Sequence, residues 1–250
     1  MIIFKLKKYK IGFYLAILFF ATTAASHASQ KLVFFATDFP PYEMENPSDP
    51  NLPGFDVEVI IEAFRRVNIQ AEINFLPWKR IILLAKKGEI AGVVSCARKK
   101  SRDNFILYSD PISYATHSFI VKADYEGKNL LTLQDAQELR NLVVSGYTTE
   151  KELRDAKVEF DESENDLLAI RRLLERPYDT FYSTRENIEY LSKANSFRDK
   201  IKIFDLRKLS YHLCFTKDWP DADKLVREFN HGLEEIRKDG AFQNIRNKYK

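Results

Sequence analysis

The stretch QAEINFLPWKRIILLAKKGEIAGVVS, residues 70–95, decides the fold class. Gln70 to Leu76 is predicted to be a strand, and a helix is predicted from Pro77 to Lys87 because proline suits the first helical position. Gly88 is typical of a residue that ends a helix, and Ile90 to Ser95 is a short apolar run typical of a buried strand. A strand, a helix and a second strand in succession predict an α/β fold with largely parallel sheets.

The same alternation extends in both directions from this stretch. Before it, a strand is predicted from Lys31 to Thr37, which Pro40-Pro41 breaks, and a helix from Asp56 to Val67. After it, a short strand from Ser118 to Lys122 leads into the polar link Ala123 to Asn129, where a second series begins. Strands of that series are predicted at 141–145, 157–160 and 178–182, with helices opened by two sequences that resemble capping boxes, Thr132-Leu-Gln-Asp135 and Ser163-Glu-Asn-Asp166.

The end of the chain indicates how the two series are joined. A strand at 201–206, a second polar link and a strand at 211–216 precede a helix at 221–249 that is interrupted at Gly240. Two series joined by two links predict a hinge, and the C-terminal segment returns to the first series. We therefore expect two lobes with two mainly parallel sheets joined by a two-strand hinge, lobe 1 from 29–121 and 211–250 and lobe 2 from 122–210.

Residues 1–28 are predicted to be a cleaved signal peptide. Four lysines precede the apolar run from Ile11 to Ala25, and small residues follow at Ser26-His27-Ala28. A membrane anchor is the alternative, but the run is shorter than the roughly 20 apolar residues that a spanning helix needs. No cysteine stands near the cleavage region to accept a lipid, so we expect a protein that is free in the periplasm and is not a lipoprotein.

Charge and cysteine content limit the partners and the chemistry. Loss of the four lysines leaves 35 basic against 36 acidic residues, a balance that does not favour binding to nucleic acid. Cys96 and Cys214 either form a disulfide, as an even pair can in an oxidising compartment, or are two small buried residues. The sequence does not decide between these alternatives.

Several short motifs, in their order and spacing, carry a resemblance to a known family. They are Phe39-Pro-Pro-Tyr42, Gly54-Phe-Asp-Val57, Pro77-Trp-Lys-Arg80, Lys87-Gly-Glu-Ile90, Arg102 followed by Ser109-Asp-Pro111, Gly146-Tyr-Thr148, and Asp239-Gly-Ala-Phe242 before Tyr249. With these motifs the chain resembles the family-3 extracellular solute-binding proteins of ABC importers over nearly the whole mature length. The resemblance implies a type II periplasmic binding fold, a small-molecule ligand between the lobes, importer membrane subunits as partners, and a monomer.

The resemblance also implies a set of ligand-binding residues. Arg102 matches the family's arginine, whose planar guanidinium suits a carboxylate, although an arginine in the basic run 98–102 could instead be solvated. Gly146 to Thr148 precede a helix whose first N–H groups favour an anionic oxygen, with a simple capped turn as the alternative. The full predicted set is Asp38, Phe39, Tyr42, Trp78, Ser95, Arg102, Gly146, Tyr147, Thr148 and Thr184, of which the aromatic members could also be core.

Two departures from the family's pattern bear on the ligand. Thr184 stands where amino-acid binders of the family usually carry the aspartate that neutralises the ligand's ammonium group, and it could simply cap the following helix. Ala97 stands where the family usually offers a hydroxyl. Asp38 or Glu186 could supply a replacement carboxylate, so a carboxylate-bearing or otherwise polar small molecule is expected, and an ordinary α-amino acid is in doubt.

The sequence contains no motif of a catalytic, metal or cofactor site. It has no His-Glu-x-x-His, Cys-x-x-Cys or Ser-x-x-Lys and no glycine-rich phosphate loop, and its histidines lack metal-ligand spacing. We therefore expect a binding protein without cofactor or metal that is not an enzyme. Two alternatives are a secreted dehydratase, with Asp38 or Glu186 as general acid, and a periplasmic sensor for a membrane receptor.

Overall fold

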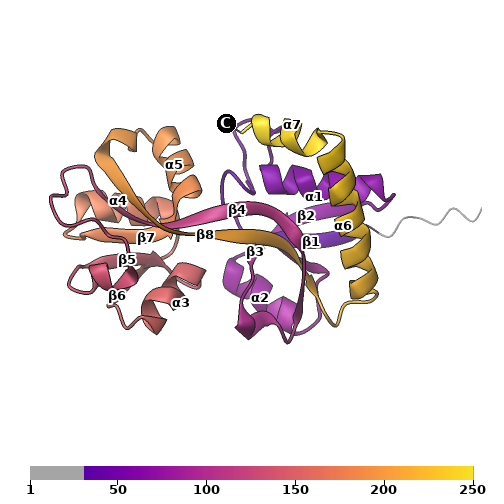
Figure 1. The fold of residues 1–250 in the computed structure, drawn as a ribbon, viewed down its shortest axis with the longest axis horizontal. Helices are drawn as coiled ribbons and strands as arrows, with labels where there is room; N and C mark the ends of the chain where they lie inside the picture. Colours follow the sequence, from indigo (N-terminus) through magenta and orange to yellow (C-terminus); the bar gives the residue numbers. More distant parts are fainter. Residues whose placement is uncertain (1–30, 250) are drawn as a thin grey trace, which may run out of the picture.

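The structure, a computed structural model, describes residues 31–249. It has two lobes connected by two long strands, as Figure 1 shows. The strands are β1 (Leu32–Ala36), β2 (Ala71–Phe75), β3 (Gly92–Ala97), β4 (Ile106–Lys122), β5 (Asn141–Val144), β6 (Phe160–Ser163), β7 (Thr180–Thr184) and β8 (Ile201–Thr216). The helices are α1 (Phe55–Arg66), α2 (Trp78–Lys86), α3 (Thr148–Asp155), α4 (Asp166–Glu175), α5 (Arg185–Ala194), α6 (Ala222–Lys238) and α7 (Ala241–Asn247), with short 3-10 turns η1 (Lys100–Arg102), η2 (Leu133–Ala136) and η3 (Arg198–Lys200).

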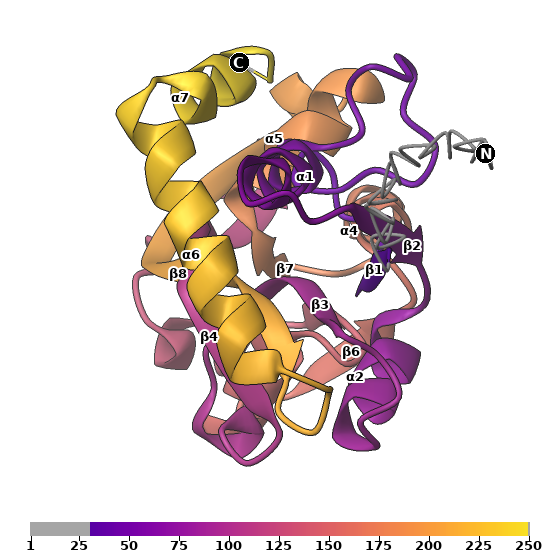
Figure 2. The same ribbon diagram turned by 90° about the vertical axis from the view of Figure 1, so that its right-hand side faces the viewer.

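Lobe 1 is a sheet covered by helices on both faces. Strand β1 pairs in parallel with β2 and β3, as the alternating sequence predicted, and β3 pairs antiparallel with β8. Successive residues of β1 point to opposite faces, so Phe34 packs with α1 and α6 while Phe35 packs on the side of α2. Helix α6 lies along the outer face of this lobe, with Phe229 against Phe64 of α1 (Figure 2).

Lobe 2 repeats this arrangement on a smaller scale. Strand β5 pairs in parallel with β6 and β7, and β7 pairs antiparallel with β4. Val143 faces one cluster with Leu153 of α3, and its neighbour Leu142 faces another with Ile170 of α4. Both lobes are therefore α/β layers, and the predicted fold class is confirmed.

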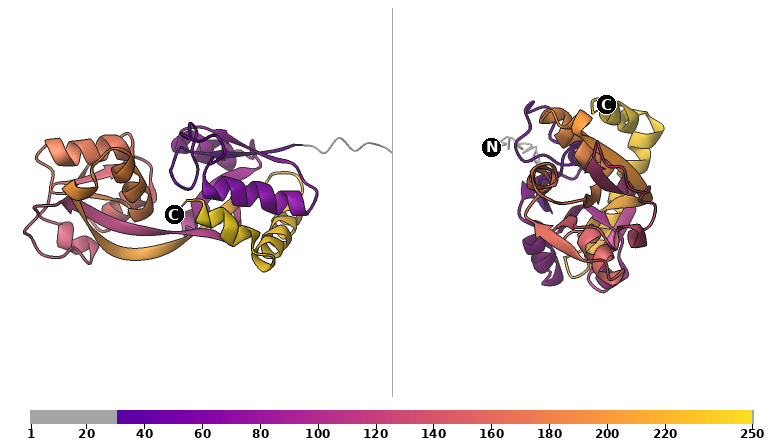
Figure 3. Two further views of the ribbon diagram at one scale, coloured as in Figure 1. Left: turned by 90° about the horizontal axis from the view of Figure 1, so that it is seen from above. Right: turned by 90° about the vertical axis from the view of Figure 1, so that its left-hand side faces the viewer.

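The connection between the lobes differs from the predicted short strands and polar links. Strands β4 and β8 pair antiparallel along their whole length, from Ile106 opposite Thr216 to Lys122 opposite Ile201, and the ribbon spans both lobes (Figure 3). The predicted link at 207–210 is therefore wrong, because these residues are paired with Tyr114 to His117. Arg207 and Lys208 are exposed since the middle of a two-strand ribbon has no core to cover, which gives strand residues the polarity of a loop.

The division into 29–121 with 211–250 and 122–210 remains a proposal, which the packing of the ribbon refines. Ala115 belongs to the core of lobe 1, whereas Phe119 and Val121 pack in the core of lobe 2. On β8, Phe204 belongs to lobe 2 and Tyr211 to lobe 1. We propose the hinge in the ribbon between these positions, a few residues earlier in β4 than the predicted boundary.

Several predicted element boundaries are corrected. Lys157 has a positive φ of 59° and lies in a turn, so the strand predicted at 157–160 begins only at Phe160. Ser163 is a strand residue, and Asn165, not Ser163, caps α4 by accepting the N–H of Leu168. The predicted capping box at Thr132 is present, but it opens the 3-10 turn η2.

The cysteine alternatives are resolved in favour of the disulfide. Cys96 of β3 and Cys214 of β8 are bonded, with Cα atoms 6.0 Å apart on adjacent strands. The bond joins segments 118 residues apart in the chain and fixes the C-terminal return within lobe 1. The predicted signal peptide, residues 1–28, lies outside the described residues, and within those residues no helix has the length and apolarity to cross a membrane.

Candidate ligand-binding site

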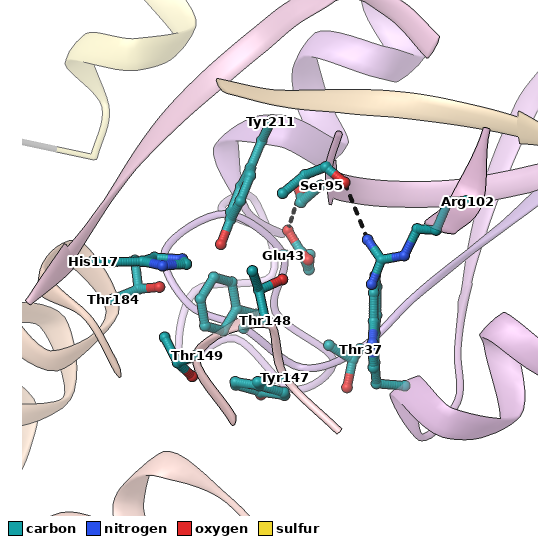
Figure 4. A pocket seen from close by; sticks show the side chains of 13 residues that line it. Thr37, Glu43, Ser95, Arg102, His117, Tyr147, Thr148, Thr149, Thr184 and Tyr211 are labelled. Atoms are coloured by element: carbon teal, nitrogen blue, oxygen red, sulfur yellow. Dashed lines mark hydrogen bonds between the residues drawn. The ribbon is translucent and has the colours of Figure 1, made fainter. Parts of the chain in front are cut away.

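A pocket lies between the lobes where strands end and helices begin. Its lining comes from the ends of β1, β3 and β7, the starts of α2 and α3, and the β4–β8 ribbon (Figure 4). The carboxyl ends of strands in open α/β sheets are the usual place for a ligand. The lining residues are Thr37, Phe39, Glu43, Trp78, Ser95, Ala97, Arg102, His117, Tyr147, Thr148, Thr149, Thr184 and Tyr211.

Arg102 is a buried cation without a carboxylate partner. Only 7% of its surface is exposed, its Nη1 donates to the carbonyl oxygen of Ala97 at 3.1 Å, and its guanidinium lies 5.1 Å from the ring centre of Trp78. Burial lowers its pKa, and no acidic side chain of residues 31–249 offsets that cost. A buried charge is stable only with a partner, so the open side of this guanidinium is suited to an anionic group of a ligand.

A pair of buried carboxyl groups lies on the lobe 1 side, and one of them, Glu43, lines the pocket. The hydroxyl of Ser95 is 2.6 Å from Oε2 of Glu43 and 2.6 Å from Oδ2 of Asp56, which also accepts from Ser113 at 2.8 Å. Burial and then the neighbouring Asp56 raise the pKa of Glu43 well above its usual range. Burial raises the pKa of Asp56 to about 7, although the hydrogen bonds from Ser95 and Ser113 act in the opposite direction.

Lobe 2 contributes hydroxyl groups at the start of α3. Tyr147, Thr148 and Thr149 line the pocket, and Oγ1 of Thr149 is buried without a hydrogen-bond partner among the described residues. Burial raises the pKa of Tyr147, which hydrogen-bonds Asp166, itself buried with a pKa raised to about 6. Lobe 2 thus presents polar but uncharged groups to the pocket at this helix start.

The ribbon contributes a histidine and a tyrosine. His117 is buried, and its Nδ1 lies 3.0 Å from Oε2 of Glu152, which also accepts from Tyr182 at 2.7 Å. Tyr211 hydrogen-bonds Thr184, and burial raises its pKa beyond the usual range. Thr184 stands at the N-cap position of α5, but its side chain makes no capping hydrogen bond. The side chain lines the pocket instead.

Seven of the ten predicted residues line this pocket. They are Phe39, Trp78, Ser95, Arg102, Tyr147, Thr148 and Thr184. Gly146 is next to Tyr147 in the chain but is not among the lining residues, and its N–H donates to the side chain of Glu150. Tyr42 is buried in the core of lobe 1 and its hydroxyl donates to the carbonyl of Tyr114, so the core alternative holds for this residue.

Neither carboxylate proposed as a replacement for the missing aspartate lines the pocket. Asp38 is exposed and accepts the N–H of Glu45 at 3.0 Å. Glu186, on α5, accepts the N–H and the hydroxyl of Thr116 on the ribbon. Both are therefore absent from the pocket lining in this arrangement of the lobes.

Five lining residues were not predicted from the sequence: Thr37, Glu43, His117, Thr149 and Tyr211. Glu43 directly follows the aromatic-proline motif, so its position was the one available signal, but a lone acid in a loop normally indicates solvent exposure. His117 and Tyr211 lie on the ribbon whose extent was not predicted. Their place in the pocket depends on the path of β4 and β8 from one lobe to the other.

The two lobes touch each other around the pocket. Nζ of Lys79 donates to the hydroxyl of Ser145 at 2.8 Å, and the rings of Phe39 and Tyr147 are 5.9 Å apart and nearly perpendicular. Asn187 of α5 donates to the carbonyl of Pro40 at 2.6 Å. These contacts join lobe 1 to lobe 2 on several sides of the pocket, which is the geometry of a closed clamp.

Two hinged α/β lobes with a polar pocket between them define a solute-binding fold. A model of the family "bacterial extracellular solute-binding proteins, family 3" matches residues 32–250, and the chain belongs to this family. The predicted resemblance is thereby confirmed.

The chain is similar in sequence to a named binding protein and in fold to solved structures of a sensor domain and a binding protein. The chain is 25% identical over 241 residues to a probable histidine-binding protein of Neisseria gonorrhoeae, covering 92% of this chain and 86% of the relative. The fold is similar to a histidine kinase sensor domain (TM-score 0.77, 19% identity, 88% of this chain and 96% of the other). It is also similar to the arginine-, lysine-, histidine-binding protein ArtJ of Geobacillus stearothermophilus (TM-score 0.74, 18% identity, 87% and 94%).

Proposed function

We propose that the protein captures a small polar solute with a carboxylate group, an amino acid or a close relative of one, between its two lobes. The observation that carries this proposal is Arg102, a buried guanidinium in an interlobe pocket that has no carboxylate partner among residues 31–249. A ligand carboxylate accepts two parallel hydrogen bonds from such a group, which favours both affinity and a fixed orientation. The names of the relatives, histidine-binding and arginine-, lysine-, histidine-binding, support amino acids as the first compounds to test.

Capture proceeds by closure of the hinge. The ligand first docks on lobe 1, where Arg102, Trp78 and Ser95 are in place without lobe 2. Tyr147 and Thr148 then reach the ligand when the lobes approach, and this additional contact favours the closed state over the open one. The ribbon of β4 and β8 is the element that bends.

The proposal places the protein in the periplasm after cleavage of residues 1–28. There it acts as a monomer and delivers its ligand to the membrane subunits of an ABC importer. The closed pair of lobes offers a joint surface that such subunits can recognise. No catalytic step, metal or cofactor is part of this function.

Two other functions are separated from it by experiment. The similarity to a histidine kinase sensor domain favours a sensing role as the second candidate, in which the closed form signals to a membrane receptor. A dehydratase is less well supported, since the two general acids considered for it, Asp38 and Glu186, do not line the pocket. Incubation with prephenate-like acids and mass spectrometry of the products tests this activity directly.

The proposed function is tested by a thermal-shift screen of the mature protein with the standard amino acids, small organic acids and short peptides. A ligand that binds only the folded state increases the free energy of unfolding and so raises the melting temperature. At a ligand concentration 100 times the dissociation constant, the gain in free energy is about 2.7 kcal/mol. We expect at least one amino acid to do so, with calorimetry giving one site per chain. A screen in which only compounds without a carboxylate bind contradicts the proposal.

A further inference from the structure

The imidazole ring of His117 on β4 is held through its Nδ1 atom, which leaves its Nε2 atom for the pocket. The residue is 1% exposed, and Nδ1 lies 3.0 Å from Oε2 of Glu152, which also accepts from the hydroxyl of Tyr182 at 2.7 Å. The other carboxyl oxygen of Glu152 accepts from Arg207. No hydrogen bond to Nε2 is present within residues 31–249, and His117 belongs to the pocket lining.

The contacts of Glu152 fix one hydrogen of this ring. Burial favours a proton on Glu152, but its three hydrogen-bond partners act in the opposite direction and lower its pKa. An ionised carboxylate is only an acceptor, so Nδ1 of His117 carries a hydrogen. Nε2 is then the atom that changes, because it is an acceptor in the neutral imidazole and a donor in the imidazolium. A carboxylate behind the ring favours the imidazolium.

Two threonines lie on the same side of the pocket as His117. Thr184 of β7 stands opposite His117 in the strand register. Thr149 of α3 is 2% exposed, and its hydroxyl oxygen has no hydrogen-bond partner among the described residues. Figure 4 shows these three side chains on one side of the view and Arg102 on the other. The pocket therefore offers hydroxyl groups that can share a ligand oxygen with His117, away from Arg102.

The acidic groups of this region do not oppose a second negative charge in the pocket. Glu43 is the only acid of residues 31–249 in the lining, and burial, followed by the charge of Asp56, raises its pKa well above the usual range. It therefore holds a proton at neutral pH. A cationic group of the ligand would find no ionised carboxylate in this lining, whereas a second anionic group would meet no like charge there.

Several other titratable groups surround His117 and bear on its protonation. They are Glu152 of α3, Tyr182 of β7, Arg207 and Tyr211 of β8, Glu186 of α5, which is bonded to Thr116, and Lys99 of lobe 1, which interacts with Glu152. Two of them are acids and two are bases, so their charges balance. Burial lowers the pKa of Lys99 to about 8, so the pH dependence of binding must be compared with that of a variant without the imidazole.

We propose that His117 is a specificity-determining residue that selects a second anionic group in the ligand, so that the preferred ligand is a small dicarboxylic acid, with or without an amino group. This inference rests on the proposed function, since it names the ligand class of the same pocket. One carboxylate binds the guanidinium of Arg102. The other accepts from Nε2 of His117, whose ring takes up a proton from solvent on binding. The carboxylate of Glu152 stabilises the imidazolium from behind.

The probes are acids and their matched amides, which differ in one charge and have nearly the same shape. They are succinate with succinamate, glutarate with glutaramate, L-aspartate with L-asparagine, and L-glutamate with L-glutamine. In at least one pair we expect the acid to bind at least about tenfold more tightly than its amide, the scale of a charge-assisted hydrogen bond. Calorimetric titration of the mature protein at pH 6.5 measures this preference.

Proton uptake gives a second signature. Imidazole is ordinarily mostly neutral at pH 7.5, so the acid should take up more protons than its amide in titrations in phosphate and in Tris, whose ionisation enthalpies differ. Affinity for the acid should also fall more steeply than that for the amide between pH 6.5 and 8.5. The limit is about tenfold per pH unit for one proton taken up.

Two histidine variants assign these effects. His117→Gln removes the charge and keeps a side chain that can donate to Glu152. It should weaken binding of the acid at least about tenfold, leave binding of the amide within about twofold, and remove the difference in proton uptake between them. His231→Gln, at an exposed histidine on α6, should bind both compounds as the wild type does.

The outcomes separate this inference from the proposed function. Equal affinity for acid and amide in all four pairs, or a preference for the acid that persists in His117→Gln, overturns the role of His117 and leaves the binding function intact. Binding of a monocarboxylate or of L-arginine while all four acids fail to bind does the same. If His117→Gln does not fold, the wild-type titrations at pH 7.5 decide, because equal proton uptake by acid and amide overturns the inference. Failure of every carboxylate compound contradicts the proposed function as well.

Discussion

The two faces of the interlobe pocket differ in their chemistry. Lobe 1 presents the guanidinium of Arg102 and the carboxyl group of Glu43, to which the hydroxyl of Ser95 is hydrogen-bonded. Lobe 2 presents the hydroxyls of Tyr147 and Thr148, and its acids lie behind the lining, as Asp166 does behind Tyr147. From this difference we propose that lobe 1 selects the ligand by charge and that lobe 2 completes the contact on closure.

Lobe 1 also differs from lobe 2 in having a covalent cross-link between its strands. The disulfide between Cys96 and Cys214 joins β3 to β8 one residue after Ser95 and one residue before Ala97, whose carbonyl accepts from Arg102. The position of the charged groups is therefore set by a covalent bond as well as by packing. The described residues of lobe 2 contain no disulfide, and this lobe depends on packing, hydrogen bonds and ion pairs such as that of Arg140 with Asp179.

The largest expected effect is that of removing this disulfide. Cys96→Ala with Cys214→Ala should lower the free energy of unfolding by about 2–5 kcal/mol, the usual cost for a small secreted domain. Hydrogen exchange should show the loss in β3 and β8 of lobe 1 and leave β5 and β7 of lobe 2 nearly unchanged. An equal loss of protection in both lobes would contradict the asymmetry.

The second prediction concerns the pH dependence of stability in the ligand-free protein. Burial raises the folded-state pKa of Asp56 to about 7, so its stabilising contribution is complete below the unfolded value near 4 and is lost as the pH rises through 7. The free energy of unfolding should fall by at most about 1.4 kcal/mol per pH unit for each proton held. Urea titrations between pH 5 and 7 measure this slope.

Matched variants assign the slope to a lobe. Asp56→Asn should flatten the decline up to pH 7, whereas Asp166→Asn in lobe 2 should flatten it only up to about pH 6, where the raised pKa of that group lies. A wild-type stability that rises from pH 5 to 7 would show that both carboxyls are ionised in the folded state.

The third prediction tests the charge on the lobe 1 face. Arg102→Ala should weaken binding of the identified ligand at least tenfold, the scale of a lost charge-assisted hydrogen bond. Arg98→Ala, at an exposed arginine four residues earlier that lies over Tyr108, is the control and should bind as the wild type does. Equal affinity of the Arg102 variant and the wild type in calorimetry would remove the main support for the site.

The smallest expected effect comes from the lobe 2 face. Thr148→Val keeps the shape of the side chain and removes its hydroxyl, at a cost of about 0.5–1.5 kcal/mol, or roughly two- to tenfold in affinity. Because lobe 2 acts at closure, the change should appear mainly as faster dissociation in stopped-flow measurements. A loss greater than that of Arg102→Ala would reverse the assignment of roles to the two lobes.

The fold was largely predictable because its signals are local. The strand-helix-strand pattern at 70–95 and the glycines that end the helices depend on neighbouring residues, and the structure confirms them. The ribbon was missed because Arg207 and Lys208 have the polarity of a loop, and only pairing with β4 makes them a strand. Pairing of distant segments leaves little trace in a single sequence.

The site was predictable to the extent that motifs mark it. Arg102, Trp78 and Thr148 were implied by the resemblance to the family, and the structure brings them together in one pocket. Glu43 was missed because burial of an acid depends on what packs around it, here Asp56 and Ser95 from elsewhere in the chain. Tyr42, the last residue of the motif that Glu43 follows, packs in the core of lobe 1 instead.

The most direct test of the account is a crystal structure of the mature protein with the amino acid that the thermal-shift screen identifies. The account predicts closed lobes and a ligand in the pocket of Figure 4, with its carboxylate in hydrogen-bond contact with the guanidinium of Arg102 and with the start of α3. A ligand bound instead in the separate groove lined by Tyr42, Tyr190 and Arg246, or an Arg102 side chain turned into solvent, would contradict it.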